Sequence, residues 1–228
     1  GYHYTDSGMY GFSCTHLSGT GVSDYGDLLM LPYSSPTKEG DHIAFYKASE
    51  VAEAGYYRAR LDDGTVIEAT AGDRTGVLKI TYPEGGAPGV MIDLNFRDRV
   101  LDKSFKAVGI GDWEGHRISE GWAREQHFYF ALSIHPIPDN TRELSDGVYW
   151  ISLPEGTTEA TLKVGMSGTS TEGAWKNYDS ELLRLNAFDA IRSETLAKWT
   201  NELAKSKVKS ASADARAIFA TALYHAYS

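Results

Sequence analysis

The sequence predicts a mainly β protein, an antiparallel β-sandwich followed by two or three helices toward the C-terminal end. Between Gly40 and Gly168, short segments with alternating apolar and polar residues are separated by turn residues, which indicates about eight to ten strands. After Thr169, apolar residues recur at every third or fourth position, as they do in helices. The 228 residues are enough for one large domain with a sizeable core.

Each expected strand combines an alternating segment with a turn signal at its end. The expected strands lie at 41–50, 55–64, 65–86 as two strands joined at 73–76, 89–98 as a more buried one, 125–136, 147–156 and 160–169.

The helical part begins with a serine and a threonine ahead of Glu172, which is a typical helix start. Asn186 is the expected N-cap of the next helix. One face of that helix is expected to carry Phe188, Ile191, Thr195, Trp199 and Leu203. A last helix is expected to bury Ile218, Phe219, Ala222, Leu223 and Ala226. Its apolar face continues to the end of the sequence, so we expect a longer protein.

Composition restricts the possible functions. The 22 basic and 31 acidic residues give a net charge of -9, which opposes binding of nucleic acid. The single cysteine cannot form an internal disulfide, and no uninterrupted apolar stretch is long enough for a membrane-spanning helix. The first residues do not form a signal peptide, so the chain is either cytoplasmic or a processed form of an exported protein.

A glycine-rich segment at residues 11–32, GFSCTHLSGTGVSDYGDLLMLP, is the most unusual feature. Its glycines are followed by no lysine, so it is not a phosphate-binding P-loop, and GVSDYG misses the spacing of a nucleophile elbow by one residue. His16, Asp24 and Asp27 could act as metal ligands, but they match no known metal motif and fit turn-capping residues better. Cys14 is a candidate nucleophile with little support, because a histidine in the sequence does not establish a spatial pairing with it. The remaining interpretation is a loop that offers its backbone and a few polar groups to a ligand.

Four segments together resemble glycoside hydrolase family 92, the calcium-dependent exo-acting α-mannosidases. They are GYHYTDSGMYGFSCTHLSGTGVSDYGDLLMLP, AGYYRARLDDGTVIEATAGDRTGVLKITYP, EGWAREQHFYFALSI and LKVGMSGTSTEGAWKN, in that order. The first segment is long and unusual, and the similarity extends over essentially the whole chain. The final segment FATALYHAYS is similar to the region that leads into the second domain of that family.

The resemblance implies a galactose-mutarotase-like supersandwich at 1–169 that lacks its first strand, followed by helical linker residues at 170–228. It also implies an (α/α)6 catalytic barrel beyond this chain, with the active site between the two domains. The family's inverting mechanism needs one carboxylic acid and one carboxylate base. Both groups, and most calcium ligands, are expected in the barrel. We therefore expect no catalytic residue and no metal site in this chain, and no activity of the chain alone.

The resemblance further implies which positions face a mannose-containing glycan. The expected substrate-binding residues are His16, Ser18, Thr20, Asp24 and Trp122. Trp113 is added from the residues themselves, because an exposed loop tryptophan can stack on a sugar. Each also has a structural interpretation: the loop residues as turn caps, Trp122 as core and Trp113 as a surface plug. Cys14 occupies the place of a histidine in the family, which bears on specificity for α-1,2 linkages.

Two alternatives remain open at this point. The chain could be a stand-alone carbohydrate-binding module, or a fragment whose main surface contacts the absent barrel. In the second case, the last two helices should leave an apolar patch and the absent first strand should leave an open sheet edge. Periplasmic or extracellular localisation is expected from the family alone.

Overall fold

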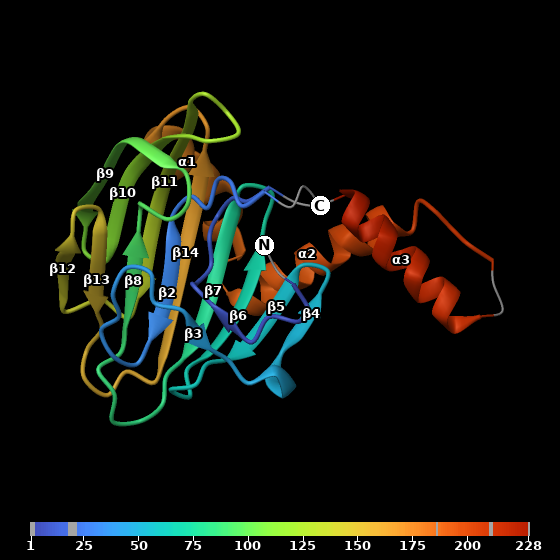
Figure 1. Cartoon of the computed structure of the whole chain (residues 1–228), viewed down its shortest axis with the longest axis horizontal. Coiled ribbons are helices and arrows are strands. Elements are labelled where there is room, and N and C mark those ends of the chain that lie inside the picture. The colour runs from blue at the N-terminus through green and yellow to red at the C-terminus, as the bar shows by residue number, and fades with distance from the viewer. Residues whose placement is uncertain (1–2, 18–21, 186, 210–211, 228) are drawn as a thin grey trace.

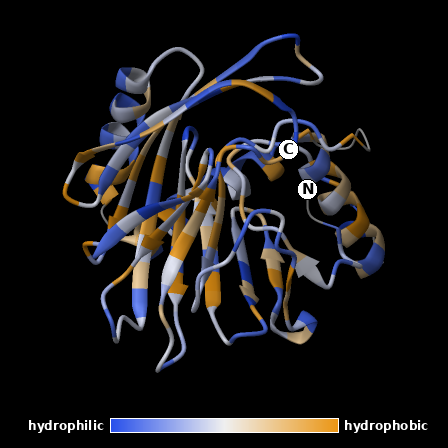
Figure 2. Ribbon diagram, turned by 60° about the vertical axis from the view of Figure 1, so that its left-hand side comes forward, coloured by the Kyte–Doolittle hydropathy of each residue, from blue (hydrophilic) through white to orange (hydrophobic). Residues whose placement is uncertain are grey.

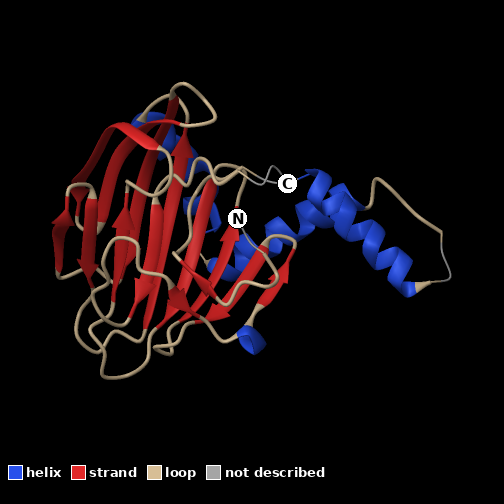
Figure 3. Cartoon of the chain, viewed as in Figure 1, coloured by secondary structure: helices blue, strands red, loops and turns tan. Residues whose placement is uncertain are grey.

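Two antiparallel sheets face each other in the computed structural model, and helices lie against the outer face of the larger sheet (Figures 1 and 3). The structure describes residues 3–17, 22–185, 187–209 and 212–227. The predicted class, mainly β with an antiparallel sandwich and C-terminal helices, is confirmed.

The larger sheet has eight strands and the smaller sheet has four. In spatial order, the larger contains β4 (Val51–Glu53), β5 (Tyr56–Arg60), β6 (Val66–Ala71), β7 (Thr75–Thr81), β14 (Glu159–Ser167), β11 (Gln126–His135), β10 (Asp112–Glu120) and β9 (Arg99–Gly109). The smaller contains β12 (Asn140–Ser145), β13 (Val148–Ser152), β8 (Gly89–Asp93) and β2 (Leu29–Tyr33). A further short pair joins β1 (Gly8–Met9) to β3 (Ile43–Ala44).

The main core lies between the two sheets, because alternate residues of each strand point inward. Figure 2 shows hydrophobic and hydrophilic residues alternating along the strands. In β10 every second residue from Trp113 to Ser119 is buried. All five residues of β8 are buried, as expected for the more buried strand.

The prediction of strands was incomplete in two places. The expected strand at 41–50 is wrong, since only the two residues of β3 form a strand there and Lys47–Ser49 forms a 3-10 helix, η1. The long hairpin of β9 and β10 was not predicted. No residue of β9 is fully buried, and the inward row of β10 includes a glycine, an arginine and a serine, so neither strand shows clear hydrophobic alternation.

Within the described residues, three α-helices and one π-helical turn follow the sandwich: α1 (Thr171–Tyr178), the turn η2 (Asp179–Leu183), α2 (Phe188–Leu203) and α3 (Ala213–Tyr227). The predicted start of α1 is confirmed, because Ser170 Oγ accepts a hydrogen bond from Gly173 N at 3.0 Å. The expected N-cap Asn186 lies outside the described residues.

A second apolar cluster attaches α1 and α2 to the larger sheet. Gly165 of β14 allows this contact, since a Cβ there would lie 2.5 Å from the carbonyl oxygen of Ala174. Phe188, Ile191 and Thr195 of α2 are buried, which confirms that part of the predicted face. Thr195 Oγ1 also donates to the carbonyl oxygen of Ala71 at 2.7 Å.

Helix α3 extends away from the sandwich (Figure 1). Its predicted buried stripe is wrong for the described residues, because none of them is buried and Ile218 is 69% exposed. The ring of Tyr224 contacts Trp199 of α2, with 4.7 Å between centroids. Among the described helices, none has the length and apolar character needed to cross a membrane.

Candidate functional site

Three loops gather at one end of the sandwich. We call them the loop cluster: residues 11–17 with 22–28, residues 94–98, and residues 121–126, which connect β10 to β11 and include Gln126, the first residue of β11. The first loop reaches the second through Tyr25 N, which donates to Asp98 Oδ2 at 3.0 Å. The third loop packs on the same carboxylate, because a Cβ at Gly121 would lie within 2.8 Å of both Asp98 oxygens. The described part of the glycine-rich segment therefore belongs to a site built from distant parts of the chain.

A buried ion pair lies beneath the loop cluster. Arg117 of β10 points into the sandwich and donates through Nη1 to Asp27 Oδ1. Both side chains have 0% exposure. Burial of a charge is costly unless the charge is paired and hydrogen-bonded. The hydrogen bonds of the remaining polar atoms of Arg117 and Asp27 therefore matter for the stability and the role of this ion pair.

The rest of the guanidinium of Arg117 is bonded to the second loop. Nε donates to the carbonyl oxygen of Leu94 at 2.9 Å, and Nη2 donates to the carbonyl oxygen of Phe96 at 2.9 Å. Nη1 also donates to Ser119 Oγ at 3.1 Å. The planar group thus fixes loop 94–98 to strand β10.

The second oxygen of Asp27 is bonded to the first and third loops. Thr15 Oγ1 donates to Asp27 Oδ2 at 2.6 Å, and Gln126 Nε2 donates to the same atom. Thr15 Oγ1 in turn accepts from Asp27 N at 3.1 Å. Because both carboxylate oxygens are engaged by donors, Asp27 is a structural anion and not a free acid, base or metal ligand.

The backbone of the loop cluster is strained. Among the described residues other than glycine, positive φ angles occur only at Tyr25 (75°), Leu28 (52°) and Arg97 (64°). All three lie in the cluster. Gly26 has φ 74°, and a Cβ there would come 2.9 Å from side-chain carbons of Phe96 and Arg97. Such conformations persist only where the surroundings enforce them, and they concentrate at functional sites.

The structure places four of the six predicted substrate-binding residues, and three of these lie in the loop cluster. His16 is exposed and forms an isolated β-bridge with Tyr25, which brings it beside the half-buried Asp24. Partial desolvation lowers the pKa of His16, which favours a neutral imidazole. Trp122 lies in the third loop and is 66% exposed, so it is not a core residue. Ser18 and Thr20 lie outside the described residues.

The expectation of an exposed loop around Trp113 is wrong. Trp113 lies on β10, is 5% exposed, and stacks on Phe105 with 6.0 Å between ring centroids. It is the first member of the inward-facing row of β10, and it belongs to the core of the sandwich.

Sequence reasoning missed Asp27, Arg117 and Gln126 as a unit. No local signal marked Arg117, because the segment DWEGHRISE shows no clear hydrophobic alternation and a buried arginine is unusual. Asp27 and Gln126 both lie in segments that carry the family resemblance. Nothing local connects the three residues, which are far apart in sequence.

Metal binding and thiol chemistry receive no support from this part of the molecule. Across the described ranges, no group of three or more His, Cys, Asp or Glu residues is arranged to hold a metal ion. The donor set beneath the loops does not suit calcium, since Arg117 already neutralises Asp27. Cys14 packs against the core, and burial raises the pKa of its thiol, which keeps it protonated and unreactive.

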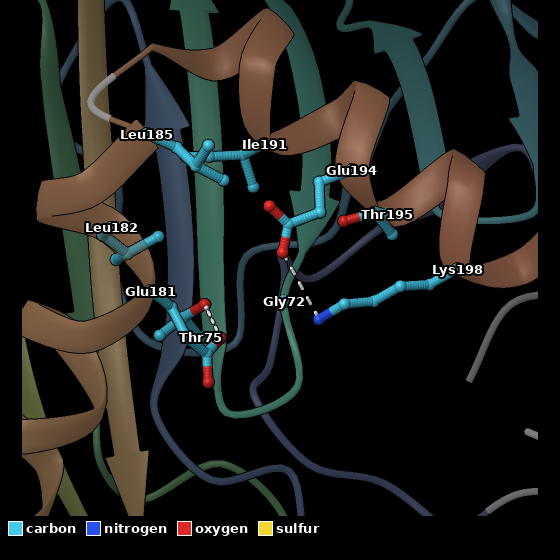
Figure 4. A pocket seen from close by; sticks show the side chains of 9 residues that line it. All are labelled: Gly72, Thr75, Glu181, Leu182, Leu185, Ile191, Glu194, Thr195 and Lys198. Atoms are coloured by element: carbon cyan, nitrogen blue, oxygen red, sulfur yellow. Dashed lines mark hydrogen bonds and ion pairs between the residues drawn. The ribbon is translucent and has the colours of Figure 1, made fainter.

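A pocket lies between η2, α2 and the turn after β6 (Figure 4). Its carboxylate Glu181 accepts hydrogen bonds from Thr75 Oγ1 at 2.7 Å and from Arg74 N at 3.2 Å. Glu194 and Lys198 form an ion pair across its other side, with 3.6 Å between Oε1 and Nζ. The contacts of Glu181 link η2 to the turn between β6 and β7, whereas the ion pair of Glu194 and Lys198 lies within α2. The polar groups of this pocket therefore have structural roles.

The fold and the site define a class: a β-sandwich domain with C-terminal helices, the last of which extends away from it, and with loops that offer polar and aromatic groups at one end. Residues 1–187 match the glycosyl hydrolase family 92 N-terminal domain, and residues 173–228 match the glycosyl hydrolase family 92 catalytic domain. The chain therefore belongs to glycosyl hydrolase family 92.

Solved structures of this family share the fold. The family GH92 α-mannosidase BT3965 from Bacteroides thetaiotaomicron is 28% identical with a TM-score of 0.83, over 100% of this chain and 34% of that one. The GH92 family glycosyl hydrolase ccman5 is 23% identical with a TM-score of 0.87, over 98% of this chain and 35% of that one. An uncharacterized secreted glycosidase of Arthroderma benhamiae is 21% identical over 92% of this chain and 33% of its own length. The chain thus spans about a third of the proteins it matches.

Proposed function

We propose that this chain is the N-terminal region of an inverting, calcium-dependent exo-α-mannosidase that removes mannose from mannose-containing glycans. Membership of glycosyl hydrolase family 92 is the observation that carries this proposal. Two relatives add to it: BT3965 was solved in complex with mannoimidazole, and BT2199 is described as an inverting mannosidase, at 29% and 19% identity. The domain division at about residue 169, with a catalytic barrel beyond the chain, is part of the proposal.

In this proposal the loop cluster forms one wall of an interdomain active site. Trp122 offers an exposed aromatic face on which a sugar ring can stack. His16, as a neutral imidazole, and Asp24 can exchange hydrogen bonds with sugar hydroxyls. Ser18 and Thr20, which follow His16 in the sequence and lie outside the described residues, are proposed as further sugar contacts.

The reaction itself is assigned to the remaining part of the full-length protein. An inverting glycosidase uses an acid and a base whose carboxyl groups are about 6.5–9.5 Å apart, with a water molecule between the base and the sugar. The buried Asp27 is engaged by Arg117 and cannot serve as either group. Calcium, which would orient sugar hydroxyls, is likewise proposed for the rest of the protein.

The preferred linkage is proposed to be α-1,2, and the location periplasmic or extracellular. The name of the Arthroderma relative, a secreted glycosidase, supports the location. The strongly exposed Trp122 also fits a second function, a carbohydrate-binding module that acts without catalysis. One assay separates these possibilities.

The assay measures release of mannose from α-1,2-, α-1,3- and α-1,6-linked disaccharides by the full-length protein and by this chain, with calcium or with a chelator. We expect fastest release from the α-1,2 substrate, only by the full-length protein and only with calcium. NMR of the first product should show β-mannose, because inversion of an α-linkage gives the β-anomer. Binding of mannose by the isolated chain, with no hydrolysis by the full-length protein, would favour the binding module instead.

A further inference from the structure

The buried hydrogen-bonded group around Arg117 has a role beyond the stability of the sandwich. We call it the Arg117 network: Arg117, Asp27, Thr15, Ser119, Gln126 and the carbonyl groups of Leu94 and Phe96. We propose that this network is a positioning device that holds the three loops of the cluster in the arrangement that receives the sugar. The inference rests on the proposed function for its link to substrate.

The pattern of bonds supports positioning. Each loop has its own connection: Thr15 in the first, the carbonyls of Leu94 and Phe96 in the second, and Gln126 in the third. All of them end on one ion pair, whose members are 90 positions apart in the sequence. A shift of one loop therefore breaks a bond to a buried charge, which is costly.

Stability of the fold alone does not explain why the ion pair of Arg117 and Asp27 lies at this end of the sandwich. The same inward row of β10 carries Trp113 and the adjacent core is apolar. A buried ion pair is often no more stabilising than well-packed apolar residues of similar volume. An apolar pair could close this end of the sandwich, but it could not bond the backbone carbonyls of a loop.

The strained backbone above the network supplies the second argument. Tyr25, Leu28 and Arg97 have positive φ angles: Leu28 directly follows Asp27, Arg97 directly follows Phe96, and Tyr25 lies two residues before Asp27. Without those bonds, such residues would relax toward ordinary conformations. Arg117 and Asp27 themselves have 0% exposure, so they act through the loops and do not touch the sugar.

The test uses the full-length protein with two changes, Arg117→Met and Asp27→Asn together. This pair removes both charges, so no unpaired ion is left in the core, but it removes the bonds to Leu94 and Phe96. We expect KM for an α-linked mannoside to rise at least about tenfold, while kcat changes less than about threefold. Loss of folded protein alone would lower the apparent kcat and leave KM unchanged.

A milder variant covers the case in which the double variant does not fold. Thr15→Val keeps the side-chain volume and removes the hydroxyl that bonds Asp27 on two sides. We expect KM to rise about threefold. The matched control for the replacement of Arg117 by methionine is Arg142→Met, which removes an exposed arginine from edge strand β12. This control should leave KM unchanged.

Hydrogen exchange of the same proteins provides a readout that is independent of activity. We expect amides of residues 22–28, 94–98 and 121–126 to exchange faster in the variants, with β14 and the rest of β11, from residue 127 on, unchanged. Unchanged loop exchange, or an unchanged KM in a folded variant, would overturn the positioning role. If the wild-type protein hydrolyses no mannoside, the proposed function fails, and loop exchange still decides whether the network orders the loops.

Discussion

Replacement of Trp122 and of Trp113 by alanine, one at a time, should have opposite effects on activity and stability. The sequence suggested both as sugar contacts, but the structure separates them. Trp122 is 66% exposed in the third loop of the cluster, and Trp113 is 5% exposed in the core. We expect Trp122→Ala to act on substrate binding, and Trp113→Ala to act on folding.

The expected magnitudes follow from burial. Truncation of a fully buried tryptophan costs about 3–5 kcal/mol, which lowers the Tm of a chain of this size by roughly 6–20 °C. About one third of Trp122 is covered, or roughly 50–80 Å² of the area a tryptophan can bury, so its loss should cost at most about 2 kcal/mol. If its ring is a central contact for the sugar, the loss of about 2 kcal/mol of binding raises KM about 30-fold.

Two measurements check this prediction. Thermal unfolding of the 228-residue chain gives the stability of each variant, and steady-state kinetics of the full-length protein give KM and kcat. A Trp122→Ala enzyme with the KM of the wild type would refute the assignment of the third loop to the active site. A large KM effect of Trp113→Ala in folded protein would show that the core tryptophan controls the site after all.

Three further predictions concern the packing described above. Gly165→Ala should lower Tm by about 2–12 °C, because the added Cβ would meet the backbone of α1. Gly168→Ala should have little effect, because the atom nearest to a Cβ there is 3.9 Å away. Equal shifts of Tm in the two variants would contradict this reasoning. Ser170→Ala removes the N-cap of α1 and should cost about 1 kcal/mol in urea unfolding, and an unchanged midpoint would exclude a capping role. The raised pKa of Cys14 keeps its thiol protonated in the native chain. Raising the pH from 8 to 9 should therefore accelerate alkylation of Cys14 by iodoacetamide in the unfolded chain and not in the native chain, as measured by mass spectrometry. Equal native and unfolded rates would show that the thiol is accessible.

The sequence predicted best those elements whose signals are local. Ser170 was found because a cap and its helix are adjacent, and the buried face of α2 was found because Phe188 and Ile191 repeat at helical spacing. Strands with apolar inward residues, such as β8, were found for the same reason. The family resemblance added the sandwich topology, which no local pattern contains.

Elements that depend on distant partners could not be predicted in this way. Trp113 was assigned to a loop because the segment DWEGHRISE shows no clear hydrophobic alternation, and only the packing of β10 in the sandwich shows which side is inward. The apolar face of α3 predicts burial, yet Ile218 is exposed because no described part of this chain packs on it. In the candidate site, His16, Asp24 and Trp122 were proposed from the resemblance, whereas the network beneath them depends on contacts between distant segments.

The ion pair of Asp27 and Arg117 also limits how this domain can change over generations. Loss of either partner alone leaves a buried charge without its counterion, at a cost of about 3–5 kcal/mol, which is a large part of the stability of an ordinary domain. A lineage can therefore exchange this pair for apolar residues only through a poorly folded intermediate, or by both substitutions at once. Among descendants of a common ancestor, we expect these two positions to be kept together or replaced together.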